Sequence, residues 1–243
     1  MYKIIILALV AMLCLCACTA KTPAAIVAEA ATEGAQESTI AKTSVGGWKI
    51  YSDDTTAPLP KQAKDAFDRA MEGLVGVKYT PIALIGTQVV AGTNYAILCR
   101  AVPVVANPET RLAVVIVYES TEGKAEIKNI ADFNLSEAME AKDNTETAAV
   151  LGGWTIPEDY SVINLPAEAA TAFTKAMEGF TGSNLEPLAY LGSQLVSGTN
   201  YAILCRATTE STAKIVVATV YADLNGGATV TGIFEVRAAD YNA

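Results

Sequence analysis

The chain has 243 residues, 51% of them hydrophobic, and its 26 Asp and Glu outnumber its 17 Lys and Arg, giving a formal net charge of −9. This acidic balance argues against a nucleic-acid partner, because nucleic-acid affinity depends on Lys and Arg neutralising phosphates. There is no His, so neither a Ser-His or Cys-His nucleophile pair nor a His-ligated metal site is available. No pair of acids is placed by a motif, so we expect a protein that is not an enzyme, with no metal and no cofactor.

The N-terminus begins with one Lys, an apolar run and small residues, a pattern typical of a secretory signal peptide over 1–17. Its end, Leu15-Cys16-Ala17-Cys18, resembles the bacterial lipobox. The resemblance implies cleavage before Cys18 and acylation of its thiol, and acyl chains hold a protein on a lipid bilayer because each buried CH₂ contributes about 0.8 kcal/mol. An ordinary signal peptide cut near residues 17–20 is the alternative. We expect a lipid-anchored protein of the cell envelope that faces outside the cytoplasm.

An internal duplication organises the rest of the chain. A shift of 106 residues aligns 46–101 with 152–207 without a gap, and 30 of these 56 positions are identical. Past that point the match is looser, and Tyr118 corresponds to Tyr221. Two repeats of this size are each expected to close a core of their own. The predicted organisation is a lipidated Cys with a flexible spacer over 18–45, a first domain over 46–134, a linker over 135–151, a second domain over 152–237 and a tail over 238–243.

Each repeat has the same predicted order of elements. A short strand at GGW is followed by a helix that begins near Pro60 or Pro166, carries apolar residues at spacings of three and four, and ends at glycines. Four β-rich runs follow, separated by turn residues such as Gly92-Thr93. They cover 79–91, 94–105, 111–120 and 124–133 in the first repeat, and 186–197, 200–209, 213–222 and 228–236 in the second. The pattern predicts an α+β fold in which one helix packs on an antiparallel meander of four or five strands.

The first predicted hairpin of each repeat carries Gln-x-Val-x-Gly, and this motif in this element order resembles the cystatin family of cysteine-protease inhibitors. The resemblance covers both repeats and implies two tandem cystatin-like domains that reversibly occlude papain-like cysteine proteases. It implies that the inhibitory first hairpins are Gln88, Val89, Val90, Ala91 and Gly92, and Gln194, Leu195, Val196, Ser197 and Gly198. It also implies an N-terminal wedge segment of Gly46, Gly47 and Trp48, and of Gly152, Gly153 and Trp154.

The second hairpin loop departs from the family pattern, because neither 120–124 nor 223–227 contains the Pro-Trp that usually anchors it. Aromatic anchors commonly dominate an interface, so a non-inhibitory protein-binding module at the bacterial envelope is the alternative function. Two structural interpretations also stay open: each motif Gly serves only the hairpin turn, and each Trp is a core residue. The two Cys of the mature repeats, Cys99 and Cys205, occupy the same repeat position and are interpreted as small buried strand residues.

Overall fold

The computed structural model describes residues 46–50, 59–140, 153–157 and 165–242. These residues belong to one compact unit, 42–243. The predicted signal peptide, the lipidation site Cys18 and the wedge residue Gly152 lie outside the described residues. Among the described helices, none is both long enough and apolar enough to cross a membrane.

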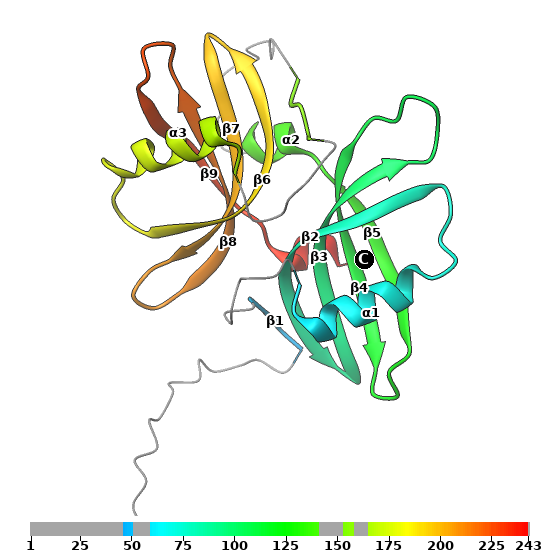
Figure 1. The fold of residues 1–243 in the computed structure, drawn as a ribbon. Coiled ribbons are helices and arrows are strands. Elements are labelled where there is room, and N and C mark those ends of the chain that lie inside the picture. The colour runs from blue at the N-terminus through cyan, green and yellow to red at the C-terminus, as the bar shows by residue number, and fades with distance from the viewer. Residues whose placement is uncertain (1–45, 51–58, 141–152, 158–164, 243) are drawn as a thin grey trace, which may run out of the picture. The chain divides into compact units, whose positions relative to one another are not determined.

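The first repeat forms a five-stranded antiparallel sheet in the order β1-β2-β3-β4-β5 (Figure 1). Its strands are β1 (Trp48–Lys49), β2 (Val77–Val90), β3 (Gly92–Pro103), β4 (Arg111–Ser120) and β5 (Ala125–Phe133). Helix α1 (Lys61–Met71) lies across one face of this sheet. Its buried residues Ala63, Ala66 and Phe67 recur at helical spacing and pack on that face.

The second repeat forms a four-stranded antiparallel sheet in the order β6-β7-β8-β9. Its strands are β6 (Asn184–Val196), β7 (Gly198–Thr208), β8 (Ala213–Ala222) and β9 (Ala228–Glu235), and helix α3 (Ala167–Met177) covers one face. A single bridge between Thr155 and Ser193 takes the place of β1. Two short elements complete the chain, α2 (Leu135–Glu140) after β5 and the 3₁₀ helix η1 (Ala238–Tyr241) after β9.

The helix and the four long strands of each repeat are confirmed in order, with ends that differ by a few residues, whereas the short strand predicted at GGW forms only in the first repeat. The first hairpin turn differs in position, because Val90 pairs with Gly92 and leaves Ala91 at the tip. The turn therefore comes before the predicted Gly92-Thr93, and Gly92 already belongs to β3. The second repeat behaves in the same way, with Val196 paired to Gly198.

Both faces of each sheet are buried. In β4, every residue from Leu112 to Val117 is buried, although a strand covered on one side alternates between buried and exposed residues. Val115 and Val117 face α1, whereas Val114 and Ile116 belong to a different cluster on the opposite face. That cluster also contains Leu191, Leu204, Ile215 and Val217 of the second sheet.

The predicted fold class is therefore wrong. The described chain is mostly antiparallel β-structure in sheets of five and four strands with few helices, and it is not two tandem cystatin-like α+β domains of a helix on a sheet. The physical reason is the second apolar face that each sheet carries. Because the helix covers only one face, the other is buried in a cluster to which both repeats contribute.

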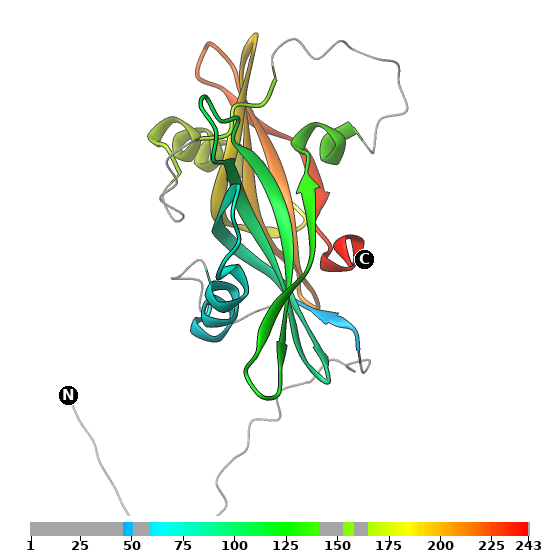
Figure 2. The ribbon, with the colours of Figure 1, turned by 90° about the vertical axis from the view of Figure 1, so that its right-hand side faces the viewer.

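The C-terminal η1 adds to this common cluster. Ala238 is buried in it, and Tyr241 packs against it, with its ring centroid 6.3 Å from that of Phe133. The Asn129 side-chain amide donates a hydrogen bond of 2.8 Å to the Tyr241 carbonyl. Figure 2 shows α1 and η1 on opposite faces of the first sheet. The last residues of the chain thus help to bury a face of the first repeat.

Candidate functional site

Three separate segments of the first repeat meet at one end of its sheet, which we call the first edge: residues 46–48, 88–92 and 120–124. Trp48 pairs with Gln88 across β1 and β2, and Gly92 pairs with Ser120 across β3 and β4. Strand pairing therefore brings together the two predicted contact regions and the turn between β4 and β5. The matching residues of the second repeat, 153–154, 194–198 and 223–227, form the second edge.

The motif Gln joins two parts of the first edge. The Gln88 side-chain amide donates a hydrogen bond of 2.7 Å to the Gly46 carbonyl, and its oxygen accepts one of 2.7 Å from Asn94. In the second repeat Asn200 donates to the Gln194 oxygen at 2.9 Å. This network fixes the base of the hairpin, so the Gln has a structural role and the remaining motif side chains are the ones presented outward.

The motif Gly is required by both backbone conformation and space. Gly92 has a φ of 137°, and a Cβ there would lie 2.2 Å from the carbonyl oxygen of Glu119 and 2.8 Å from the Tyr118 ring. Gly198 has a φ of 139°, and its Cβ would lie 2.4 Å from the carbonyl oxygen of Ala222. Contacts this short do not occur for real side chains. The motif Gly therefore has a structural role, although it lies at the start of β3 or β7 and not in the turn itself.

A Tyr braces each hairpin tip from the neighbouring strand. The Tyr118 hydroxyl donates a hydrogen bond of 2.6 Å to the Ala91 carbonyl, and the Tyr221 hydroxyl donates one of 2.6 Å to the Ser197 carbonyl. Each bond holds the main chain at the point where it reverses. The tips are thus supported elements and suit a rigid contact surface, since less conformational entropy is lost on binding.

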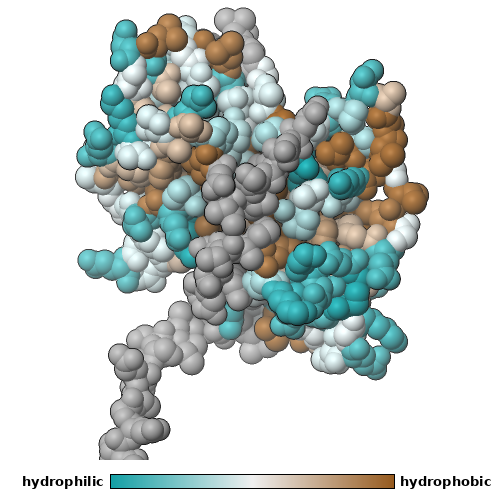
Figure 3. All heavy atoms as spheres, viewed as in Figure 1, coloured by the Kyte–Doolittle hydropathy of each residue, from teal (hydrophilic) through white to brown (hydrophobic). Residues whose placement is uncertain are grey.

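The apolar motif side chains point to solvent at both edges. Val89 is 60% exposed and Leu195 is 76% exposed, and their neighbours Val90 and Val196 are also exposed. Figure 3 shows hydrophobic residues at the ends of the β6–β7 and β8–β9 hairpins, and the latter tip carries Leu224, which is 85% exposed. Exposed apolar side chains gathered on braced hairpins are typical of a protein contact surface.

The two edges differ in the turn that joins β4 to β5 in the first repeat and β8 to β9 in the second. In the first repeat this turn is Ser120–Lys124, where the Lys124 ammonium lies 3.4 Å from the Glu122 carboxylate. In the second it is residues 223–227, where Asp223 accepts hydrogen bonds from the main chain of Asn225 and Gly227 and leaves Leu224 at the tip. The first edge therefore presents charged side chains at this turn, whereas the second presents an exposed Leu beside its Asp.

The predicted wedge tryptophans are placed as core residues. Trp48 and Trp154 are partly buried and pack against the cluster that both sheets share. The indole nitrogen of Trp48 is buried without a hydrogen-bond partner among the described residues. Gly47 is half-buried and Gly153 is exposed. Of the described wedge residues, Gly46 and Gly153 are therefore the ones fully presented to solvent.

A carboxylate of β4 is clamped under α1 in the first repeat. Glu119 accepts hydrogen bonds from Tyr95 at 3.0 Å, from Gln62 at 3.4 Å and from Arg69, with which it also forms an ion pair. Its side chain is only 13% exposed. Burial, together with this neighbouring carboxylate, raises the pKa of Tyr95 to about 12. The hydroxyl therefore keeps its proton, and the clamp ties α1 to β4.

The two cysteines of the described residues are not activated. Cys99 and Cys205 are buried and free, as interpreted from the sequence. Burial raises the pKa of the Cys99 thiol and raises the pKa of the Cys205 thiol to about 12, so neither is a thiolate at neutral pH. Over the same part of the chain, no group of three or more acidic or Cys side chains is placed to hold a metal ion.

Sequence reasoning missed the bracing residues, Asn94, Tyr118 and their partners in the second repeat. Their signal was present, because Asn94 lies in the nearly identical segment 88–101 and Tyr118 is retained as Tyr221 in the looser part of the repeat. A polar residue that both repeats keep beside a turn is a candidate for supporting that turn. The clamp was missed because only the first repeat has it.

A comparison of the chain with models of known protein families and with curated proteins finds no match.

Proposed function

We propose that this protein is a non-catalytic binding protein that inserts its braced hairpin tips into a cleft of another protein, and that papain-like cysteine proteases are its targets. The observation that carries the proposal is the pair of exposed apolar tips, Val89-Val90 and Leu195-Val196, each held by a Tyr hydrogen bond. A tip of this kind fills a cleft through apolar contact and shape.

The target class is supported by the meeting of three segments at one end of the sheet. The resemblance of Gln88–Gly92 to the cystatin motif implies contact through an N-terminal Gly segment and two hairpin turns, and residues 46–48, 88–92 and 120–124 do meet. Such a plug acts by occupying the active-site cleft. It presents no group that reacts, so inhibition is expected to be reversible.

The test is a titration of papain with the purified protein, measured as residual peptidase activity. We expect inhibition at micromolar concentration or below. Val90→Asp and Val196→Asp each place a charge on one tip, at positions where the side chain is exposed. Burying an unpaired charge in the interface is expected to weaken inhibition by about tenfold or more for the repeat that acts.

Val104→Asp is the matched control. Val104 is 72% exposed and lies in the connection between β3 and β4, away from both edges. The same Val-to-Asp change there is expected to leave inhibition unchanged. A folded protein that inhibits none of several papain-like proteases at micromolar concentration would defeat the proposed target class.

A second candidate function, a non-inhibitory binding module, is favoured by the turns at 120–124 and 223–227, which lack an aromatic anchor. It predicts a partner that is not a protease but uses the same tips. A photoreactive amino acid at position 90 or 196 is expected to crosslink that partner, and the same group at position 104 is not. Crosslinking from position 104 alone would place the contact surface elsewhere.

We also propose that Cys18 is acylated and holds the protein on the outer side of a membrane. The support is the lipobox-like Leu15–Cys18 in the sequence. The protein from cells is expected to partition into a detergent phase, and Cys18→Ser is expected to move it to the aqueous phase. Equal partition of both forms would contradict the anchor.

A further inference from the structure

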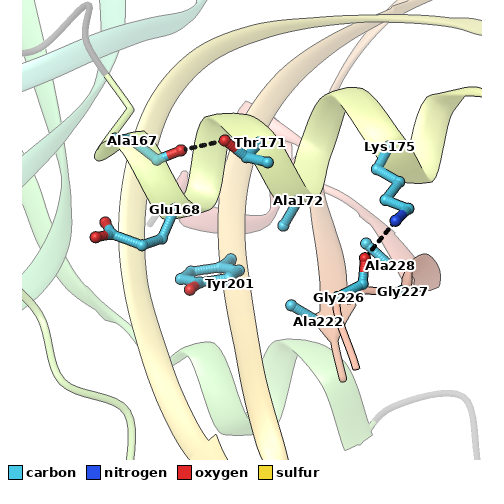
Figure 4. A pocket seen from close by; sticks show the side chains of 10 residues that line it. All are labelled: Ala167, Glu168, Thr171, Ala172, Lys175, Tyr201, Ala222, Gly226, Gly227 and Ala228. Carbon is cyan, nitrogen blue, oxygen red and sulfur yellow. Dashed lines mark hydrogen bonds between the residues drawn. The ribbon is translucent and has the colours of Figure 1, made fainter. Parts of the chain in front are cut away.

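The clamped carboxylate of the first repeat has no counterpart in the second. Thr93 pairs with Glu119, and the equivalent Thr199 pairs with Ala222, so the two β-strand positions correspond. Where the first repeat has its Glu side chain, the second has a hollow of about 370 Å³ between α3 and the end of the β8–β9 hairpin (Figure 4). The equivalent space is therefore filled by the Glu119 side chain in the first repeat and open in the second.

The open version keeps the hydrogen-bond donors of the filled one. The shift of 106 residues that aligns the repeats places Tyr201 at the position of Tyr95 and Lys175 at the position of Arg69. Both Tyr201 and Lys175 line the hollow. Figure 4 shows Ala222 and Ala172 between them, which gives the hollow an apolar wall beside its two polar groups.

These donors have capacity for a ligand. The Lys175 ammonium donates one hydrogen bond to the Gly226 carbonyl, and an ammonium group has three N–H bonds. The Tyr201 hydroxyl also lines the hollow and can donate one hydrogen bond. An ammonium and a hydroxyl beside an apolar wall suit a carboxylate with a short hydrocarbon part.

We propose that this hollow is a carboxylate-binding site. The ligand's carboxylate accepts a hydrogen bond from the Lys175 ammonium, its hydrocarbon part lies on Ala172 and Ala222, and Tyr201 forms the wall toward Glu168. The chain itself provides the template, because Glu119 makes the equivalent contacts with Tyr95 and Arg69 in the first repeat. The site is independent of the function proposed for the hairpin tips.

One residue of the hollow opposes a carboxylate. Glu168 occupies the position of Gln62, which donates to Glu119 in the first repeat. Figure 4 shows Glu168 at the opposite end of the hollow from Lys175. Its negative charge is expected to weaken anion binding. Removal of this charge is therefore expected to raise the affinity for an anion, and that direction can be tested.

Propionate is the natural probe, because it has the atoms of a Glu side chain beyond the Cα. Binding to the purified protein is measured from the shifts of the amide NMR signals of Gly226, Gly227 and Ala228. We expect saturable binding of propionate in the millimolar range, and binding of its neutral isostere propionamide that is weaker by about tenfold or more. Equal binding of the two, or no saturable shift with propionate, would overturn the proposal.

Further tests use substitutions in the hollow, the first of which places the Glu of the first repeat at the equivalent position of the second. Ala222→Glu refills the hollow with a carboxylate of the chain and is expected to abolish propionate binding. Glu168→Gln removes the opposing charge and is expected to tighten it, whereas a site for cations would lose affinity. Glu178→Gln, at the exposed C-terminal end of α3, is the control for a general charge effect and is expected to change nothing.

The converse substitution keeps the test valid if Ala222→Glu prevents folding. Glu119→Ala opens the first repeat and is expected to create a second propionate site, seen as shifts of residues 123–125. Failure to gain this site in a folded variant would overturn the assignment of Glu119 as the template.

A larger probe distinguishes whether the bound carboxylate belongs to an acidic side chain of a partner protein or to a free short-chain acid. A glutamate whose amino and α-carboxyl groups are both blocked carries the same carboxylate on a peptide backbone. It therefore represents the acidic side chain of a partner protein. Binding at least as tight as that of propionate assigns the site to such a side chain. Weaker binding assigns it to a free short-chain acid.

Discussion

At the scale of single residues, the hairpin tips depend on a glycine that the neighbouring strand leaves no room to replace. Gly92 approaches the main chain of β4, and its φ of 137° is one that L-residues rarely adopt. The Gly of the motif is therefore explained by the fold alone. Its presence says little about what the tip binds, and the information on binding lies in the exposed side chains beside it.

Gly92→Ala is accordingly expected to lower the free energy of unfolding by about 3 kcal/mol, from backbone strain and overpacking together. Chemical denaturation measures this change. Gly123→Ala is the matched control, because Gly123 also has a positive φ but a Cβ there would meet nothing within 4 Å. It is expected to lose only about 1 kcal/mol, the steric cost of the left-handed conformation. Equal losses for both variants would show that the close approach to β4 is unimportant.

At the scale of elements, the helices and strands follow from patterns that the sequence displays. The apolar spacing in α1 is clear, and Pro60 and Pro166 stand directly before the two main helices. The strands were also predictable in position, because turn residues separate them. The hairpin turn was misplaced by a residue because Gly92 was assumed to form the turn, whereas it is the first residue of β3 and allows a close approach to β4.

The burial of both faces of the central strands could have been predicted from the sequence. Residues 112–117 read LAVVIV and residues 215–220 read IVVATV, without the alternation of a strand that faces water on one side. Such runs indicate strands covered on both faces. A single helix of eleven residues covers one face, so the runs already required something else on the other.

At the scale of the whole molecule, the two repeats depend on one another because their sheets contribute to a common cluster. Leu98 of the first sheet and Leu204 of the second are both fully buried in it. Each repeat has a core cluster of its own under its helix, but the shared cluster on the opposite face was not predicted. Sequence patterns within a repeat show that a face is apolar, but they do not show which distant segment covers it.

This dependence predicts that the repeats unfold together. Leu204→Ala is expected to remove about 3 kcal/mol from the free energy of unfolding by creating a cavity in the common cluster. Hydrogen exchange of the Ile97 amide in β3 and of the Ile203 amide in β7 is then expected to accelerate by the same factor, because both amides open in one global event.

Ile203→Ala is the comparison, since Ile203 is fully buried on the opposite face of β7, under α3. It is expected to accelerate exchange in both sheets as well if unfolding is fully cooperative. Faster exchange in β7 with unchanged exchange in β3 after Leu204→Ala would show instead that the repeats unfold separately.

The position of η1 has a consequence for the timing of folding. Ala238 and the Tyr241 carbonyl complete contacts with residues of the first repeat, although they are synthesised about a hundred residues after it. At a synthesis rate of about 5–20 residues per second, the first repeat waits on the order of ten seconds for them. Until then a sheet face remains uncovered. The first repeat therefore stays incompletely folded until η1 has emerged, a state in which chaperones have time to act on it.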